Sequence, residues 1–327
     1  MKIVVLDDYS NAFRTSPHFP RLKDHEVVIF RDTEKNLDKL AARLKDAEAV
    51  VLTQERSSFP RELAGKVPRL KLIAQTGSHR FHFDRAACSE QGILICAAPP
   101  SGIKAYSTAE LTWGLIFASV RHIPYEVQQL KQGNWQSTSG TELHGKTLAV
   151  YGLGKIGGWV AEAGRAFGMR VTCWGRENSR NRARDKGYEV PQSREAFFAE
   201  ADVLTLHIFA DDSTRGIVTA ADLACMKPTS LLVNTSRMRL IEDGALVAAL
   251  QKGRPGFAAV DVYEEEPVLG GNHPLLHMPN ALCTPHLGYA VDEKYENFYR
   301  TAIDNILAFA SGKPINVYNA EALAGAR

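Results

Sequence analysis

The sequence predicts an α/β protein with two domains, each built around a parallel sheet with crossover helices. Three observations support this prediction. The chain has 327 residues, which suits two domains of about 150 residues each. Short apolar runs alternate with longer helical patterns along the chain. A breaker cluster at 97–102, with the sequence AAPPSG, separates two series of these runs.

The first series predicts a small sheet. Its expected strands are 2–6, 26–30, 49–52, 70–75 and 94–96, with a helix near 37–45. The second series follows a long apolar helix at about 105–121. Its expected strands are 147–151, 170–174, 203–207, 231–234, 257–262 and 282–284.

A last helix, at about 292–310, ends at the terminator sequence SGKP. A lone terminal helix needs a surface to pack on. Packing on the first domain would make that domain discontinuous. We therefore expect one domain formed by 1–100 and 288–327, with a second domain at 101–287 inserted into it.

Composition excludes several classes of protein. The formal net charge is +2, so nothing attracts the chain as a whole to nucleic acid or to an anionic membrane. No apolar run approaches the ~20 residues of a membrane helix, and the N-terminus does not resemble a signal peptide. The five cysteines are scattered without a Cys-x-x-Cys pair, which favours reduced thiols in a cytoplasmic protein without a metal site.

The sequence GLGKIG at 152–157 matches a dinucleotide-binding fingerprint, with an apolar strand before it and a helical pattern after it. The first glycine permits the turn, the second lets the backbone approach a pyrophosphate, and the third lets the helix pack close to the strand. The alternative is a tight turn without a ligand. The expected cofactor contacts in this loop are Gly152, Gly154, Lys155, Ile156 and Gly157.

The cofactor-selecting position at the end of the next strand holds Gly175 followed by Arg176, where an NAD-selecting acid is expected. A basic loop follows from 176 to 186. One interpretation is a solvated surface loop. The other is a pocket for a ribose 2′-phosphate, with Arg176 as the main contact, which favours NADP(H). Glu177 keeps NAD(H) possible, because a shifted loop would bring its carboxylate to the ribose.

Polar residues stand beyond three later strands, where open α/β sheets bind ligands. The three segments are NTSR at 234–237, DVYEEEP at 261–267 and TPH at 284–286. Together with the glycine-rich loop, and with the segments 84–93 and 142–148, they resemble the D-isomer-specific 2-hydroxyacid dehydrogenase family over nearly the whole chain. The resemblance implies a Rossmann-type cofactor domain at 101–287, inserted in a smaller flavodoxin-like substrate domain.

The resemblance also implies the site. His286 is the expected general acid/base, Glu266 the acid that orients it, and Arg237 the substrate-binding arginine. Glu266 is chosen over its two glutamate neighbours because the family acid stands just before the proline. Thr235 and Asp261 are similar to residues at the nicotinamide end of the cofactor. His207, a rival of His286, lies beside the cofactor in the family.

The family's substrate loop reads Gly-x-Gly, but here it reads Gly77-Ser78-His79-Arg80. The backbone N–H groups of Ser78 and His79 can still bind a carboxylate, so Gly77, Ser78 and His79 are expected substrate contacts. The expected substrate is a small 2-oxo or 2-hydroxy acid of D configuration, and its identity stays open. Two alternatives also stay open: a nicotinamide-dependent sensor or co-repressor, and a dehydrogenase of another small anion such as phosphite.

The helix at about 105–121 is apolar on more than one side. It must therefore be buried around most of its girth. The resemblance implies that this helix, with the chain through Trp135, forms a two-fold homodimer interface. The alternative is a helix enclosed between the two domains of one chain.

Overall fold

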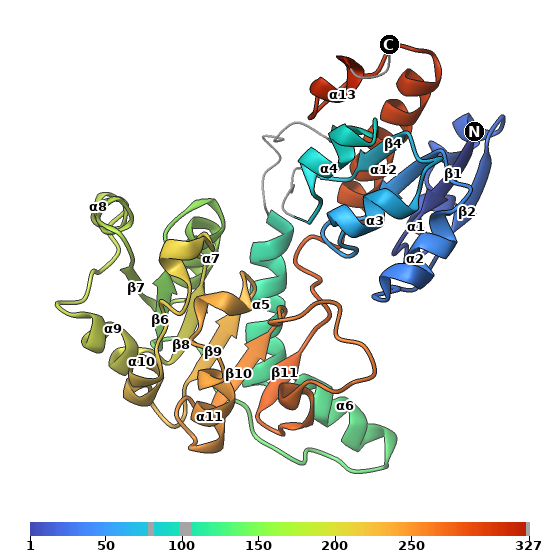
Figure 1. The fold of residues 1–327 in the computed structure, drawn as a ribbon. Helices are drawn as coiled ribbons and strands as arrows, with labels where there is room; N and C mark the ends of the chain where they lie inside the picture. Colours follow the sequence, from blue (N-terminus) through green and yellow to red (C-terminus); the bar gives the residue numbers. More distant parts are fainter. Residues whose placement is uncertain (78–81, 98–105, 325–327) are drawn as a thin grey trace. The chain divides into compact units, whose positions relative to one another are not determined.

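The computed structural model describes residues 1–77, 82–97 and 106–324. The chain divides into two compact units, one formed by Met1–Ile103 and Val291–Arg327 and the other by Lys104–Ala290. Each unit has a sheet whose paired strands are all parallel, with helices along its faces (Figure 1). The prediction of two parallel-sheet α/β domains is confirmed.

The first unit has a five-stranded sheet in the order β2-β1-β3-β4-β5. Its strands are β1 (Lys2–Val5), β2 (Glu26–Ile29), β3 (Ala49–Leu52), β4 (Leu72–Gln75) and β5 (Leu94–Ala97). One face packs on α2 (Leu37–Leu44), α3 (Arg61–Lys66) and α4 (Arg85–Glu90). The other packs on α1 (Ala12–Thr15) and α12 (Asp292–Ala310). The short η1 (Phe19–Leu22) and α13 (Glu321–Ala324) complete this unit.

Helix α12 has the predicted bounds and belongs to the first unit. Tyr299, Ile303 and Ile306 are fully buried in the same cluster as Ile3 and Val5 of β1. The C-terminal helix therefore covers the sheet with which the chain began. This arrangement makes the first unit discontinuous in sequence.

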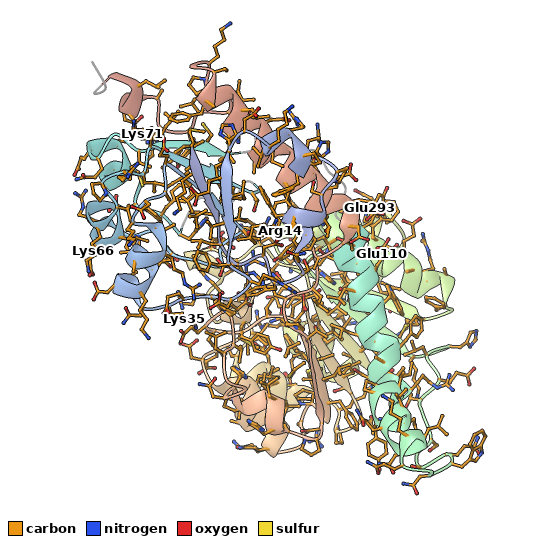
Figure 2. All side chains as sticks on the ribbon, turned by 90° about the vertical axis from the view of Figure 1, so that its right-hand side faces the viewer. Arg14, Lys35, Lys66, Lys71, Glu110 and Glu293 are labelled. Carbon is orange, nitrogen blue, oxygen red and sulfur yellow. The ribbon has the colours of Figure 1, made fainter. Side chains whose placement is uncertain are left out.

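Helix α2 shows how local sequence sets an element of this unit. The Asn36 side chain caps it by accepting from the backbone N–H of Asp38 and Lys39. Leu40 and Leu44 face the core, and charged side chains cover the outer surface. Lys66 of the neighbouring α3 lies on the outside of this unit (Figure 2) and pairs with Asp38 of α2.

The second unit has a six-stranded sheet in the order β11-β10-β9-β8-β6-β7. Its strands are β6 (Thr147–Tyr151), β7 (Arg170–Trp174), β8 (Val203–Leu206), β9 (Leu231–Asn234), β10 (Phe257–Val260) and β11 (Ala281–Cys283). Its helices are α5 (Tyr106–Val120), α6 (Ile123–Lys131), α7 (Lys155–Ala166), α8 (Glu177–Asp185), α9 (Arg194–Glu200), α10 (Ala220–Cys225) and α11 (Ala245–Gln251), with short turns η2 (Asp212–Thr214), η3 (Met238–Leu240) and η4 (Pro274–His277).

The side chains of β6 point alternately to the two faces of the sheet, and the core of this unit therefore has two layers. Leu148 and Val150 pack on the face that carries α5 and α7, and Ala149 and Tyr151 pack on the face that carries α9, α10 and α11. Strands buried on both faces read as continuous apolar runs. This is why the predicted strands were recognisable in the sequence. Among the described residues, no helix has the length and apolarity required to cross a membrane.

Candidate functional site

The carboxyl ends of the second unit's strands all meet at one edge of the sheet, because every pairing is parallel. Neighbouring strands lie about 4.8 Å apart. The glycine-rich loop follows β6, and Arg176 and His207 follow β7 and β8. Thr235, Asp261 and His286 follow β9, β10 and β11. The structure thus brings the sequence-predicted residues of this unit to a single edge.

His286 and Glu266 form a hydrogen-bonded pair at this edge. The Nδ1 atom of His286 bonds to Oε2 of Glu266. The other carboxylate oxygen accepts from the backbone N–H of Tyr263 at 2.9 Å. The two side chains are 18% and 23% exposed, so the pair is shielded but reachable. A carboxylate on Nδ1 favours the tautomer with its proton there, which leaves Nε2 as the ring atom that exchanges a proton.

Asp261 holds the loop that carries His286. Its carboxylate is fully buried and accepts from the backbone N–H of Leu287 at 2.6 Å and of Gly288 at 2.8 Å. It also accepts from the Thr284 hydroxyl at 2.7 Å. His286 has a φ of 54°, a left-handed conformation that costs energy for a non-glycine residue. Bonds on both sides of His286 keep it there.

Burial raises the pKa of the Asp261 carboxyl, and its three hydrogen bonds together with His286 act in the opposite direction. The bonds themselves assign Asp261 to the support of the histidine loop. Its contact with the nicotinamide, which the family resemblance implies, stays a prediction.

Arg237 is placed by a tight turn after β9. The Asn234 side chain accepts from the backbone N–H of Ser236 at 3.0 Å and donates to the carbonyl of Arg237 at 3.1 Å. The half-buried Arg237 side chain donates to the Ser236 carbonyl at 2.8 Å. Thr235 is buried, with its hydroxyl 2.8 Å from that of Thr112 on α5. The turn fixes the backbone that carries the guanidinium.

The glycine-rich loop requires two of its glycines for packing. Gly152 has a φ of 98°, and a Cβ there would lie 2.7 Å from the His207 carbonyl oxygen. A Cβ on Gly157 would lie 2.1 Å from the Gly152 carbonyl oxygen. Gly154 differs, because no described atom lies within 4 Å of its would-be Cβ. Space above Gly154, at the N-terminus of α7, fits the close approach of a pyrophosphate.

The prediction that 176–186 forms a loop is wrong, because Glu177–Asp185 forms α8. Arg176 is the N-cap of this helix and has an extended backbone, and Glu177 begins the first turn. Glu177 accepts from Arg180 at 2.5 Å and Arg184 at 3.4 Å. These arginines hold the pKa of Glu177 below its usual range. Its carboxylate therefore faces its own helix.

The basic residues of this segment differ in their contacts. Arg182 donates to the backbone carbonyl of Leu153 at 2.9 Å. Arg176 is 72% exposed, donates to the Ser213 hydroxyl at 2.8 Å and lies 3.9 Å from Asp211. Arg176 can therefore reach a ligand at the end of β7 by giving up one hydrogen bond to a neutral hydroxyl.

His207 connects β8 to the glycine-rich loop. Its backbone N–H donates to the Tyr151 carbonyl at 2.8 Å. Burial lowers the pKa of the imidazole to about 3, so the ring is neutral at pH 7. In the described part of the chain, its buried Nε2 has no hydrogen-bond partner. A neutral ring with Nε2 unmatched suits a cofactor neighbour better than an acid catalyst.

Of the predicted substrate loop, Ser78, His79 and Arg80 lie outside the described residues, and Gly77 follows β4 with a φ of 72°. Next to it lies Gln54, a residue that no motif in the sequence singled out. Gln54 has a φ of 54°, donates its N–H to the Thr76 hydroxyl at 2.8 Å and accepts at its carbonyl from the Gln75 side chain at 2.9 Å. It carries no sequence signal, since glutamine is not a turn residue.

The side chain of Gln54 is unusual. The residue is 9% exposed, and its Nε2 has no hydrogen-bond partner in the described chain. A Cβ on Gly77 would lie 3.0 Å from that Nε2. The amide therefore lies directly against the start of the predicted substrate loop. A buried amide without a partner is costly, and such groups call for an explanation.

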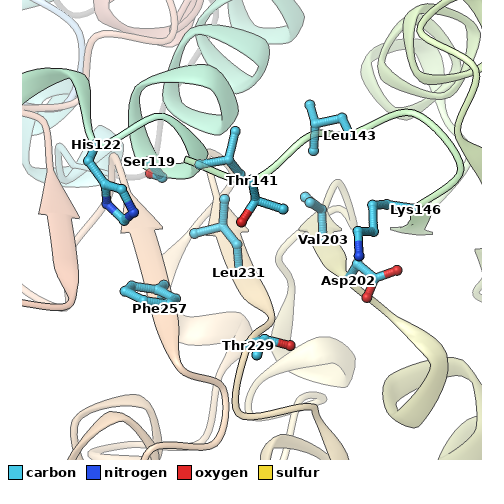
Figure 3. Close-up of a pocket in the computed structure, with 11 residues that line it drawn as sticks. Ser119, His122, Thr141, Leu143, Lys146, Asp202, Val203, Thr229, Leu231 and Phe257 are labelled. Atoms are coloured by element: carbon cyan, nitrogen blue, oxygen red, sulfur yellow. The ribbon is translucent and has the colours of Figure 1, made fainter. Parts of the chain in front are cut away.

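A cavity of about 300 Å³ lies at the opposite edge of the second unit's sheet (Figure 3). It is lined by residues at the amino ends of strands, such as Val203, Leu231 and Phe257, and by His122 between α5 and α6. The predicted site residues are not among its lining. This cavity is therefore separate from the candidate site.

Comparisons with known proteins agree with this geometry. Residues 113–288 match the family model described as "D-isomer specific 2-hydroxyacid dehydrogenase, NAD binding domain". The glyoxylate reductase of Aeropyrum pernix is 36% identical over 295 residues, which are 87% of this chain and 86% of the relative. The D-3-phosphoglycerate dehydrogenase of Methanocaldococcus jannaschii is 36% identical over 258 residues. These residues are 78% of this chain and 48% of that relative. A solved phosphoglycerate oxidoreductase from Vibrio cholerae is 45% identical, with 95% of this chain and 99% of its own covered and a TM-score of 0.89.

Proposed function

The chain belongs to the D-isomer specific 2-hydroxyacid dehydrogenase family, and we propose that His286, Glu266 and Arg237 carry its chemistry. The protein is an NAD(P)-dependent oxidoreductase that transfers a hydride between its cofactor and a D-2-hydroxy acid or the matching 2-oxo acid. The observation that carries the proposed roles is the Glu266–His286 pair, held in place by Asp261.

In the proposed mechanism, Nε2 of protonated His286 gives its proton to the carbonyl oxygen of the 2-oxo acid as C2 is reduced. In the reverse direction the neutral ring takes the proton from the hydroxyl. Glu266 holds the ring through Nδ1 and stabilises the imidazolium. The planar guanidinium of Arg237 binds the substrate carboxylate or keto oxygen and stabilises developing negative charge. The nicotinamide, when bound, supplies or accepts the hydride.

The proposed binding residues divide between the two units. Gly152, Gly154, Lys155, Ile156 and Gly157 would hold the pyrophosphate, with His207, Thr235 and Asp261 nearer the nicotinamide. In the first unit, Gly77, Ser78 and His79 would bind the substrate carboxylate through backbone N–H groups. The open position at Gly154 supports the cofactor part of this proposal.

A substrate panel tests the function. Absorbance at 340 nm is followed with NADPH and NADH against glyoxylate, hydroxypyruvate, pyruvate and bulkier 2-oxo acids. The expected result is turnover of at least one small 2-oxo acid, and loss of that turnover in His286→Ala. Cofactor binding without turnover of any 2-oxo acid would instead favour the sensor or co-repressor alternative, and reduction of NADP⁺ by phosphite would favour the other dehydrogenase.

For the cofactor we propose a preference for NADP(H). Position 175 is a glycine and so has no carboxylate to repel a 2′-phosphate, and the exposed Arg176 offers a planar fork to it. The test compares kcat/KM for both cofactors in wild type and Arg176→Ala, with Arg184→Ala as the control because Arg184 instead pairs with Glu177. We expect Arg176→Ala to lower kcat/KM about tenfold to a hundredfold for NADPH and far less for NADH. An equal effect on both would reject the phosphate pocket.

We also propose that the chain is a cytoplasmic homodimer. No residue of α6 is buried, and its side chains Ile123, Tyr125, Val127 and Leu130 are 46–58% exposed. Trp135, just beyond α6, is 78% exposed. Such a row of large apolar groups marks an interaction surface. Light scattering should give about 72 kDa, twice the 36.0 kDa of the chain, and Leu130→Asp should shift the mass towards the monomer. A wild-type mass of 36 kDa at micromolar concentration would refute the dimer.

The proposed location follows from the thiols. All five cysteines are free and three are buried. Reduced, unpaired thiols are usual in the cytoplasm.

A further inference from the structure

We propose that Ser179 and Arg182 of α8 are positioning residues that hold the glycine-rich loop by its middle peptide and so set cofactor affinity. The inference rests on the proposed role of this loop as the dinucleotide site. Neither residue needs to touch the cofactor for the effect, because both act through Leu153.

The contacts that carry the proposal meet at Leu153, the residue between the first two glycines of the loop. Its backbone N–H donates to the Ser179 hydroxyl at 3.0 Å. Its carbonyl accepts from Nε of Arg182 at 2.9 Å. Both backbone polar groups of Leu153 are therefore bound by side chains of one helix, and we call this arrangement the α8 clamp.

The α8 clamp fixes a peptide whose orientation matters. Leu153 is followed directly by Gly154, the N-cap of α7, where the open space for a pyrophosphate lies. Ser179 is 8% exposed and Leu153 is 2% exposed, so water cannot easily replace the buried bond from the Leu153 N–H to Ser179. The bond from Arg182, an exposed residue, is partly buried. Without the clamp, both backbone groups lose their protein partners and the loop loses its fixed orientation.

Gly175 has a place in the same arrangement. Its φ is 148°, and a Cβ there would lie 3.0 Å from Cβ and 3.2 Å from the hydroxyl oxygen of Ser179. A side chain at position 175 would require Ser179, whose hydroxyl binds Leu153, to shift by a few tenths of an ångström. Gly175 therefore permits the α8 clamp, whether or not it also leaves room for a 2′-phosphate.

Because of the α8 clamp, an acid at position 175 should affect cofactor binding differently from an acid at this position in other dinucleotide-binding domains. An acid at the end of the second cofactor strand normally selects NAD. Here Gly175→Asp would displace Ser179 as it adds the acid. We expect this variant to bind both NADPH and NADH more weakly, instead of exchanging one preference for the other.

The experiment measures the dissociation constants of NADPH and NADH directly, and kcat and the cofactor KM separately. The variants are Ser179→Ala, Arg182→Ala and the double variant, with Arg182→Lys as a conservative rescue. Arg184→Ala is the matched control, because Arg184 lies on the same helix but pairs with Glu177 and Asn181. Far-UV circular dichroism and Tm establish that each variant is folded.

We expect each alanine variant to raise the dissociation constant and KM of both cofactors about tenfold, the usual effect of one charge-assisted or buried hydrogen bond. kcat should stay within about twofold, since the acid/base pair is untouched. The double variant should lose less than the sum of the two, because both side chains hold one peptide. Arg182→Lys should recover part of the affinity, and Arg184→Ala should behave as wild type.

Two results would overturn the proposal. One is a folded Ser179→Ala or Arg182→Ala variant that binds both cofactors as wild type does, even if its Tm has fallen. The other is a Gly175→Asp variant that gains NADH affinity without loss elsewhere. Failure of the proposed function is distinguishable, because it would appear as a wild-type chain that binds neither dinucleotide or reduces no 2-oxo acid.

Discussion

The two sheets of this chain share a strand order, but different side chains follow the carboxyl ends of their strands. Numbered within each unit, both run 2-1-3-4-5, and the second unit adds a sixth strand beyond the fifth. In doubly wound sheets of this order, ligands bind at the carboxyl edge where the strand order reverses, between the first and third strands. That point follows β1 and β3 in the first unit and β6 and β8 in the second. The backbone topology thus predicts where ligands bind in each unit, but not what they are.

In the second unit, the charged groups at this edge are matched within the protein. Glu266 binds His286, and Asp261 binds three donors of the neighbouring loop. Groups matched in this way are held in one geometry before a substrate arrives, which is what stabilisation of a transition state requires.

In the first unit, the edge combines matched and unmatched groups. Asp7 has a φ of 60° and is buried, and it accepts from the hydroxyls of Ser57 and Thr33. Gln54 has both backbone groups bound but an amide Nε2 without a partner among the described residues. The two edges therefore differ: the second unit's edge carries groups already matched within the protein, and the first unit's edge carries an amide donor that no described residue binds.

The largest effect is expected from substitutions that break the Glu266–His286 pair of the second unit. His286→Ala should lower kcat by about 10²–10⁴, the range for loss of a positioned acid or base. Glu266→Gln should shift the pH profile of kcat more than it lowers its maximum, because it changes the group on Nδ1 and keeps Nε2. Both variants are checked by steady-state kinetics over pH. A His286→Ala enzyme with wild-type kcat would reject the assignment of the acid/base.

A smaller effect should follow from loosening the support of that pair. Asp261→Asn keeps one acceptor oxygen, so at least one of the N–H groups of Leu287 and Gly288 loses its partner. We expect a loss of about 1–3 kcal/mol in the free energy of unfolding and a fall in kcat. Urea unfolding and kinetics measure both. An unchanged kcat would mean that the left-handed turn at His286 does not depend on Asp261.

The fold was largely predictable because parallel strands buried on both faces appear as continuous apolar runs. The structure has strands with the predicted bounds at 49–52, 147–151, 170–174 and 231–234, and a helix with the predicted bounds at 292–310. Short helices such as α9 and α10 were not predicted, since seven and six residues are too few for a clear helical period. Their local signals were the Ser193 and Thr219 caps and an acidic residue in each first turn.

The site was predictable in part. Residues at strand ends could be named from the sequence, because parallel topology brings those ends together. For the segment that forms α8, the sequence could not decide between a solvated surface and a phosphate pocket. Arg182 donates to the backbone carbonyl of Leu153, which only the tertiary fold brings near. Gln54 could not be found at all. Its left-handed backbone and unmatched amide depend on neighbours from β4, more than 20 positions away.

Removing the amide of Gln54 should weaken substrate binding without lowering the stability of the protein. Gln54→Met keeps the length of the side chain and removes the amide. We expect an unchanged or higher Tm, since a buried unpaired polar group disappears, together with a KM for the 2-oxo acid raised about tenfold. The cofactor dissociation constant should not change and serves as the internal control. A lower Tm with an unaltered KM would make Gln54 a structural residue only.

The smallest expected effect concerns how the two reversal points respond to pH. Burial lowers the pKa of His207 from 6.5 to about 3, so between these values the unfolded chain binds a proton that the folded chain does not. His207 therefore makes the protein less stable as pH falls from 6.5, by at most about 1.4 kcal/mol per pH unit. Burial raises the pKa of Asp7 above 3.8, so there the folded chain binds the extra proton. Its contribution falls as pH rises through the raised value. In urea unfolding at several pH values, His207→Gln should flatten the loss of stability below pH 6.5, whereas Asp7→Asn should steepen it above pH 3.8. If the His207→Gln curve has the same slope as wild type, the imidazole is not held neutral and its place beside the glycine-rich loop must be more open to solvent than the geometry indicates.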